Sequence, residues 1–169
     1  NRSFAWAQID VPGNKDLWAV SVHLLTASST ERELEGKALT AFIQSKVPAG
    51  SYVSIGGDFN TDARDEPVLP SLAPVVTIPT MFPDDGAGNG NTSTNRTKPY
   101  DWVLTDSALT TKEIPVAIKQ KSFQHGLVFD TQVYAPIADL MPPIVGGESR
   151  ATNMQHMAVV RDFQLTCGQ

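Results

Sequence analysis

The chain has 169 residues, of which 41% are hydrophobic and 18% charged, and its formal net charge is −5. These proportions are typical of one folded domain and exclude an intrinsically disordered chain. No apolar run is long enough to cross a membrane as a helix. The negative charge leaves no basic footprint for nonspecific nucleic-acid binding, which weakens a DNA substrate without excluding it.

Two strands and one clear helix are predicted in the first fifty residues. The strands, residues 3–11 and 16–25, flank a Pro-Gly-Asn turn that favours an antiparallel hairpin. Thr30 and Glu33 have the spacing of a capping box and predict the start of a helix. An apolar stripe at helical spacing then continues it, formed by Leu34, Ala38, Leu39, Phe42 and Ile43.

The rest of the chain alternates strands with loops. The near-continuous apolar run over residues 52–59 predicts a central strand. Two long polar or proline-rich segments, residues 83–99 and 136–151, predict loops, and loops of this length are often functional. The remaining predicted elements are a short helix over residues 66–72 and strands over residues 100–105, 113–119 and 156–166.

The most informative motif is Gly-Gly-Asp-Phe-Asn, which ends the strand over residues 52–59. At an extended strand end, side chains two positions apart point the same way, so Asp58 and Asn60 are expected side by side. The first is an anion that can hold a metal or accept a proton, and the second is an amide that can donate to an oxyanion. An ordinary turn, with Asp and Asn bonding their own backbone, is the alternative interpretation.

Three further polar residues lie at the edges of predicted strands. They are His23 near the end of its strand, Asp101 within Pro-Tyr-Asp-Trp-Val-Leu, and His156 at the start of the last strand. In this order with Asp58 and Asn60, they resemble the endonuclease/exonuclease/phosphatase superfamily. Its matching segments read as a strand with His, then GDFN, a YD strand and SDH. The resemblance extends over residues 4–165.

This resemblance implies an α/β (α+β) fold, part of a four-layer α/β/β/α sandwich with a mostly antiparallel, DNase I-like sheet. No segment matches the family's metal-binding Glu or the Asn near its first strand. Residues 1–169 are therefore expected to be the C-terminal portion of a single domain of this kind. A second departure is Gln155, which stands where the family has an acid and cannot act as an anionic ligand.

The resemblance also implies a metal-dependent phosphodiester hydrolase, in the first place a nuclease. Asp58 would orient or deprotonate the attacking water, and Asn60 would donate to a phosphoryl oxygen. His156, oriented by Asp101, would contact the phosphate, and His23 would act near the leaving oxygen. Mg²⁺ or Mn²⁺ is the expected cofactor because the ligands are oxygens; the metal positions would be Asp58, Asn60 and Gln155.

Other readings of these residues stay open. Asn95, Arg96 and Lys98 lie in the long loop before Asp101, where they are predicted to contact a substrate phosphate or simply to be solvated. Gln155 and the unmatched Glu favour an alternative function, a non-catalytic binding or structural module on the same scaffold. Without that Glu, the isolated chain is expected to be inactive.

Half of a two-sheet sandwich must leave a sheet face uncovered, and we expect this to be the apolar face of residues 18–22 and 53–55. The expected partners are the phosphodiester substrate, with nucleic acid among the candidates, the N-terminal half of the domain, and a second copy on the uncovered face. Cys167 is predicted to be a free thiol, or to pair with that half in an exported protein. Few Lys and many Thr, Ser and Asn favour an extracellular or periplasmic location.

Overall fold

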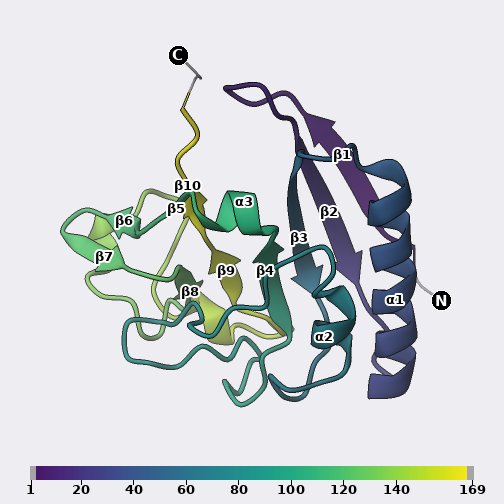
Figure 1. The fold of residues 1–169 in the computed structure, drawn as a ribbon. Helices are drawn as coiled ribbons and strands as arrows, with labels where there is room; N and C mark the ends of the chain where they lie inside the picture. The colour runs from purple at the N-terminus through teal and green to yellow at the C-terminus, as the bar shows by residue number, and fades with distance from the viewer. Residues whose placement is uncertain (1–2, 167–169) are drawn as a thin grey trace.

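The computed structural model describes residues 3–166, so Cys167 lies outside the described residues. The fold is of the α/β class, as predicted, and its sheets are mostly antiparallel (Figure 1). A four-stranded sheet and two helices form one side of the molecule, and short two-stranded sheets form the other. Among the described residues, no helix is both long and apolar enough to cross a membrane.

The four-stranded sheet has the order β1-β2-β3-β4. The first two strands form the predicted antiparallel hairpin, and β2 and β3 run parallel because a helix connects them. The last pair is antiparallel. The bounds are β1 (Ala5–Ile9), β2 (Leu17–His23), β3 (Tyr52–Asp58) and β4 (Asp101–Thr105).

The connecting helix, α1 (Ser29–Lys46), begins before the predicted capping box. Ser28 is the N-cap and accepts a hydrogen bond from the Glu31 N–H at 3.2 Å, so the box predicted at Thr30 and Glu33 is wrong. The predicted apolar stripe is only partly the packing face, since Leu34 is 60% exposed. The buried positions are Arg32, Gly36, Leu39, Thr40 and Ile43.

The close approach of a second helix, α2 (Val68–Leu72), explains this rotation of α1. A Cβ atom at Gly36 would lie 2.3 Å from the Ser71 hydroxyl and 3.0 Å from a Val68 methyl group. A side chain at this position would displace Ser71 and crowd Val68, so glycine allows the Gly36 face of α1, and not the Leu34 face, to turn inward. The short helix predicted over residues 66–72 is therefore present and packs against α1.

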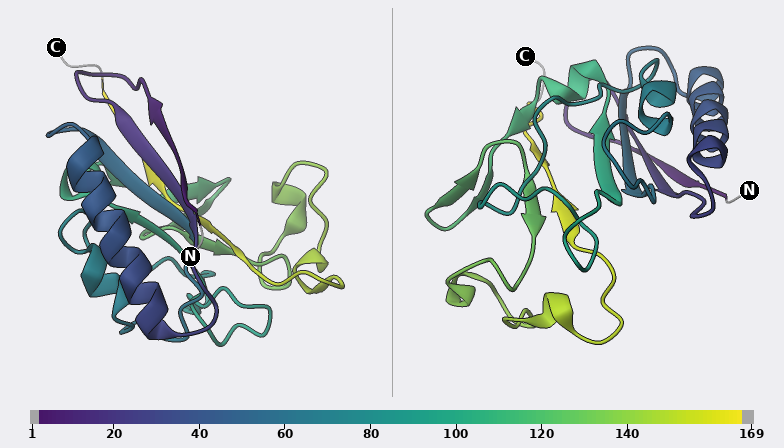
Figure 2. Two further views of the ribbon diagram at one scale, coloured as in Figure 1. Left: turned by 90° about the vertical axis from the view of Figure 1, so that its right-hand side faces the viewer. Right: turned by 90° about the horizontal axis from the view of Figure 1, so that it is seen from below.

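The hydrophobic core lies between the sheet and these two helices (Figure 2). The expectation that the apolar face of residues 18–22 and 53–55 is uncovered is wrong, because α1 and α2 cover it. Its buried side chains include Val20, Val22, Val53, Ile55 and Leu104. Strand alternation places small or polar residues on the opposite face, which is half-buried to exposed: Ala19, Ser21, Ser54 and Gly56.

The remaining elements are short, and several differ from the predictions. The predicted strand over residues 113–119 is interrupted at Pro115, which lacks a backbone donor, and the one over residues 156–166 is divided at Arg161. Strand pairs β5–β10, β6–β7 and β8–β9 form three small antiparallel sheets. The elements are α3 (Ser107–Thr110), β5 (Glu113–Ile114), β6 (Val116–Ile118), β7 (Lys121–Phe123), β8 (Leu127–Phe129), η1 (Ile137–Asp139), η2 (Glu148–Arg150), β9 (Ala158–Val160) and β10 (Asp162–Phe163).

Candidate active site

The register of the main sheet brings three of the predicted residues into one row. His23 pairs with Asp58 across β2 and β3, and Asp58 pairs with Asp101 across β3 and β4. Their chain neighbours Val22 and Trp102 are buried on the helical side, so alternation directs the three polar side chains to the opposite face. The row therefore lies at one end of the sheet, on the face that the helices do not cover.

Gly57 allows the first contact of this row. Its φ is +138°, and a Cβ atom at this position would lie 2.1 Å from the carbonyl oxygen of Val22. Only a residue without a Cβ atom fits between the two strands here. The close approach brings Nε2 of His23 to 3.2 Å from Oδ2 of Asp58.

Asp58 and Asn60 also lie together, but the reason differs from the predicted strand alternation. Asn60 has the left-handed φ of +53°, and its backbone N–H donates to Oδ1 of Asp58 at 2.8 Å. Its side-chain Nδ2 donates to Oδ2 of Asp58 at 3.2 Å and to the carbonyl oxygen of Leu24 at 2.8 Å. The juxtaposition is thus made by an Asx-type turn, so both interpretations of the motif describe the same geometry.

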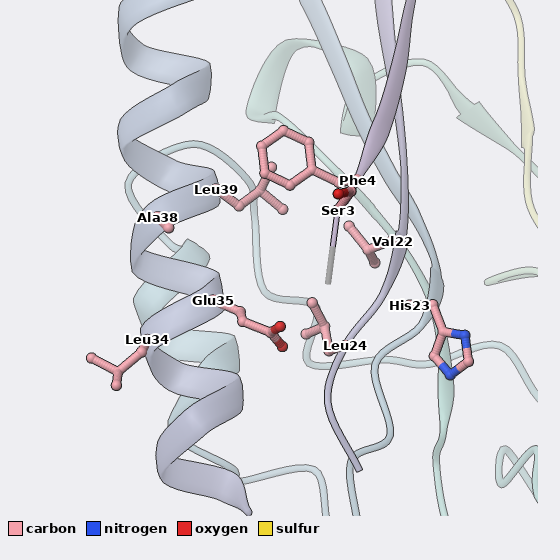
Figure 3. Close-up of a pocket in the computed structure, with 9 residues that line it drawn as sticks. All are labelled: Ser3, Phe4, Val22, His23, Leu24, Leu34, Glu35, Ala38 and Leu39. Atoms are coloured by element: carbon pink, nitrogen blue, oxygen red, sulfur yellow. The ribbon is translucent and has the colours of Figure 1, made fainter. Parts of the chain in front are cut away.

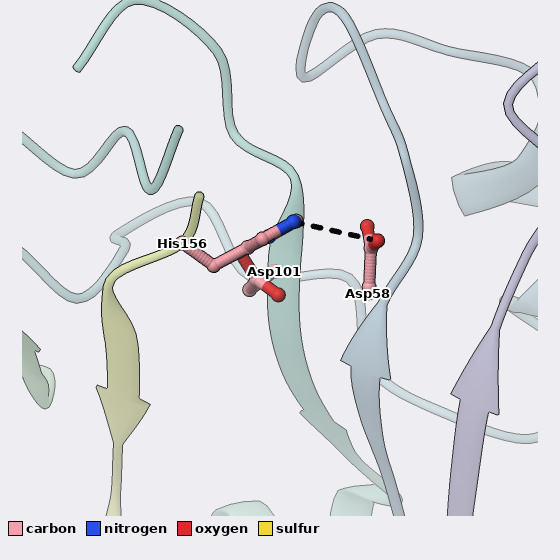
Figure 4. A group of neighbouring side chains, drawn as sticks. All are labelled: Asp58, Asp101 and His156. Carbon is pink, nitrogen blue, oxygen red and sulfur yellow. Dashed lines mark hydrogen bonds and ion pairs between the residues drawn. The ribbon is translucent and has the colours of Figure 1, made fainter. Parts of the chain in front are cut away.

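His156 completes the cluster from a distant part of the chain (Figure 4). A bridge between Ser93 and His156 places this residue beside the start of β4. Its Nδ1 lies 2.9 Å from Oδ2 of Asp101, the contact that we expected, and its Nε2 lies 3.8 Å from Oδ2 of Asp58. All five residues predicted as catalytic therefore gather at one edge, although their roles remain predictions.

Two carboxylates directly opposite each other on adjacent strands repel. Burial, the largest effect, raises the pKa of Asp101 above its usual value, and the nearby Asp58 carboxylate raises it further. Hydrogen bonds with His156 and Thr92 act in the other direction without cancelling this rise. Asp101 therefore binds a proton more readily than an ordinary Asp. The negative charges of the two carboxylates are thus incompletely compensated by the positive groups around them.

Sequence reasoning missed Thr92, which connects the two halves of the cluster. This residue is 1% exposed, and its hydroxyl accepts a hydrogen bond from the backbone N–H of Asp101 at 2.8 Å. Its carbonyl oxygen accepts from the N–H of Met157, next to His156, at 2.7 Å. Nothing in the sequence distinguishes this threonine from the other polar residues of its loop.

The structure does not bring Arg96 to the cluster. Its guanidinium pairs with Asp130 at 2.5 Å and with Asp85 at 2.9 Å, and all three side chains are at most 10% exposed. The proposed contact between Arg96 and a substrate phosphate is therefore unsupported, because this cation is already neutralised. Lys98 lies nearer the surface and pairs with Asp62 at 2.5 Å.

A hollow of about 460 Å³ borders the cluster at Asn60 and His156. Asn95 and Gln155 also line it, both from exposed positions. Gln155, predicted at a metal position, therefore lies beside the cluster, and its metal role stays a prediction. The other lining residues are Ser93, Thr94 and Tyr100.

A second, apolar hollow of about 380 Å³ lies between α1 and the strands β1 and β2 (Figure 3). Leu24 and Glu35 point into the space between helix and strands, whereas the imidazole of His23 points away from it. Glu35 accepts a hydrogen bond from the backbone N–H of Leu25 at 2.8 Å. His23 is also among the lining residues, so this hollow adjoins the polar cluster at that residue.

The cluster has a donor set that suits a divalent cation. Ligand atoms of Asp58, Asp101 and His156 all lie within 4.8 Å of one another. Carboxylate oxygens are the ligands that Mg²⁺ prefers, and Mn²⁺ also accepts imidazole. The amide oxygen of Asn60 accepts no hydrogen bond among the described residues and lies at the same edge. The residues present therefore fit such an ion, with Asp58 and Asp101 as its anionic contacts.

Comparison with known proteins gives a likeness in fold. No family model and no curated protein matches the sequence. A conserved protein of unknown function from Enterococcus faecalis V583 superposes with a TM-score of 0.60 at 11% identity, over 95% of this chain and 56% of that one. That likeness concerns the fold alone.

Two further solved structures have lower scores. Beta toxin from Staphylococcus aureus gives a TM-score of 0.49 at 17% identity, over 74% of this chain and 54% of that one. Sphingomyelinase C from Streptomyces griseocarneus gives 0.47 at 17% identity, over 72% and 53%. The chain thus spans about half the length of each of these three proteins.

Proposed function

We propose that this chain carries the catalytic cluster of a metal-dependent phosphodiester hydrolase of the endonuclease/exonuclease/phosphatase type. The observation that carries the proposal is the row of His23, Asp58 and Asp101 across three strands, with His156 between the two carboxylates. Side chains of these types at one edge would supply an acceptor for a water proton, a donor for phosphoryl oxygens and contacts for a cation. These are the requirements of phosphodiester hydrolysis.

The contacts of these side chains support a role for each of them in the proposed reaction. Asp58 is held by the backbone N–H of Asn60, so its carboxylate is fixed where it can accept a proton from an attacking water. Asp101 holds Nδ1 of His156, which leaves Nε2 to donate to a phosphoryl oxygen when protonated. The half-exposed His23 lies beside it as a further donor, whereas the Asn60 side chain already donates to Asp58 and Leu24 and offers its amide oxygen to a cation. A bound divalent cation supplies neutralisation of the phosphoryl charge.

We also propose that the chain is the C-terminal portion of a longer domain. Its coverage of about half of each similar structure supports this, as does the open sheet face of small residues. The N-terminal half would cover that face and supply the Glu that this sequence lacks. A second copy on the same face is the other candidate partner, and export from the cytoplasm is part of the proposal.

The activity is tested with bis-p-nitrophenyl phosphate and plasmid DNA, on the chain alone and joined to its upstream coding region, with Mg²⁺ or Mn²⁺. The longer protein should cleave the ester, and Asp58→Asn or His156→Ala should each reduce kcat about 10²- to 10⁴-fold. Asp65→Asn and His125→Ala are matched controls outside the cluster and should retain activity.

A binding or structural module is the second candidate, and Gln155 in place of an acid favours it. Gln155→Asp distinguishes the two, because an acid there should strengthen metal binding in an enzyme. If the longer protein cleaves neither substrate and Gln155→Asp does not activate it, the binding module replaces the hydrolase.

A further inference from the structure

We propose that the hollow beside His156 receives a neutral, hydroxyl-rich alcohol of the phosphate ester, a sugar or another polyol, rather than a nucleic-acid chain. This inference rests on the proposed phosphodiester hydrolysis and names its substrate class. A phosphate held between Asn60 and His156 would place one of its ester groups in the hollow, because both residues line its edge.

The lining of the hollow is polar and, apart from His156, carries no formally charged side chain. Its other residues are Asn60, Ser93, Thr94, Asn95, Tyr100 and Gln155. Amides and hydroxyls both donate and accept hydrogen bonds, as do the hydroxyl groups of a polyol. A volume of about 460 Å³ is sufficient for a group of monosaccharide size.

Two amide side chains of the hollow have hydrogen-bonding capacity to spare. Oδ1 of Asn95 accepts from the hydroxyls of Ser93 at 2.8 Å and Thr97 at 2.7 Å, which fixes the orientation of the amide. Its Nδ2 group then has two donors that meet no acceptor among the described residues. The Gln155 side chain likewise forms no hydrogen bond within residues 3–166. Both amides can therefore serve hydroxyl groups of a ligand.

The charges around the hollow argue against a polyanion. A nucleic-acid chain presents a further phosphate at each nucleotide, and each needs a cationic partner for affinity. Arg96 is neutralised by the buried carboxylates of Asp85 and Asp130, and Lys98 is paired with Asp62 in a more exposed ion pair. The cations nearest to β4 in sequence are thus engaged, and the chain as a whole has a net charge of −5. A single phosphate with a neutral alcohol meets no such requirement.

The test compares two esters with the same leaving group, the p-nitrophenyl phosphodiesters of myo-inositol and of thymidine, on the protein with its upstream region. We expect at least about 10-fold higher kcat/KM for the inositol ester. Asn95→Leu and Gln155→Leu should each reduce this preference about 3- to 10-fold, mainly through KM, as expected for the loss of one or two hydrogen bonds. Gln120→Leu, an exposed glutamine outside the hollow, is the matched control and should leave it unchanged.

Equal rates for the two esters, a faster thymidine ester, or variants that behave like Gln120→Leu would overturn the inference. If bis-p-nitrophenyl phosphate is not cleaved either, the hydrolase proposal fails, and the hollow is tested by binding alone. In that case the side-chain amide NMR signals of Asn95 and Gln155 are followed during titration with glycerophosphoinositol and with dithymidine phosphate. Shifts with the first ligand only support the polyol site, and any other pattern rejects it.

Discussion

Replacing Gly57 by alanine should destabilise the fold and separate His23 from Asp58. At φ +138° an L-residue is strained, which costs about 1–3 kcal/mol. The new Cβ atom would lie 2.1 Å from the carbonyl oxygen of Val22, more than 1 Å inside an ordinary contact. Strand β2 must therefore move, and each ladder hydrogen bond lost adds about 1 kcal/mol. We expect a total cost of about 3–5 kcal/mol from these two contributions.

Gly56→Ala is the matched control one residue earlier. A Cβ atom there meets its nearest neighbour, the carbonyl oxygen of Trp102, at 3.7 Å, an ordinary van der Waals distance. Its effect should stay within about 1 kcal/mol. Urea unfolding measures both free energies, and imidazole NMR signals report whether His23 still contacts Asp58. If the two variants unfold within 1 kcal/mol of each other, the explanation of the β2–β3 register by Gly57 is wrong.

Three other predictions follow from buried or strained groups. Arg32→Met should lower the free energy of unfolding by about 3–5 kcal/mol, because it leaves Glu66 buried without its bidentate partner. Lys37→Met, which removes only an exposed ion pair with Glu33, should lower it by less than about 1 kcal/mol, as measured by chemical unfolding. Because burial raises the pKa of Asp101, the folded protein keeps a proton that the unfolded chain loses near pH 3.8, so the contribution of Asp101 to stability falls as pH rises through this window. In a pH series of unfolding curves, Asp101→Asn should lack this contribution when compared with the unchanged protein. Asn60→Gly should keep the +53° backbone and the stability within about 1 kcal/mol, while kcat falls about 10²- to 10³-fold in the ester assay. An unchanged rate would exclude a catalytic role for the amide.

The sequence predicted the helices and strands whose own residues carry a strong local signal for that structure. The hairpin of β1 and β2, helix α1 and strand β3 have long apolar patterns and clear turn residues. Strands β7 and β8 and helix α3 were missed because each has only three or four residues and depends on tertiary partners. The orientation of α1 was missed for a similar reason, since the contact of Gly36 with α2 determines it.

The candidate site shows the same limit. Residue types, their order and the resemblance that they carry predicted that His23, Asp58, Asp101 and His156 meet. Adjacent strands of the main sheet bring the first three together, whereas His156 precedes a strand of another sheet. The engagement of Arg96 was not predictable, since its partners are 11 and 34 residues away in the sequence and neither lies in a motif. From the sequence alone, a cationic side chain in a loop beside the motif is easily taken for a substrate contact, because the carboxylates that pair with it cannot be identified.

The row of Asp58 and Asp101 is costly for a sheet and useful for a phosphate site. Like charges on directly opposite residues destabilise a strand pair, and the two side chains are only 16% and 18% exposed, so water screens them incompletely. A sheet optimised for stability alone would have opposite charges at these positions. Here His156 lies between the carboxylates and reaches only one of them closely, at 2.9 Å from Asp101 against 3.8 Å from Asp58. The remaining repulsion favours a cation at this edge, and that cation is also what an incoming phosphate requires.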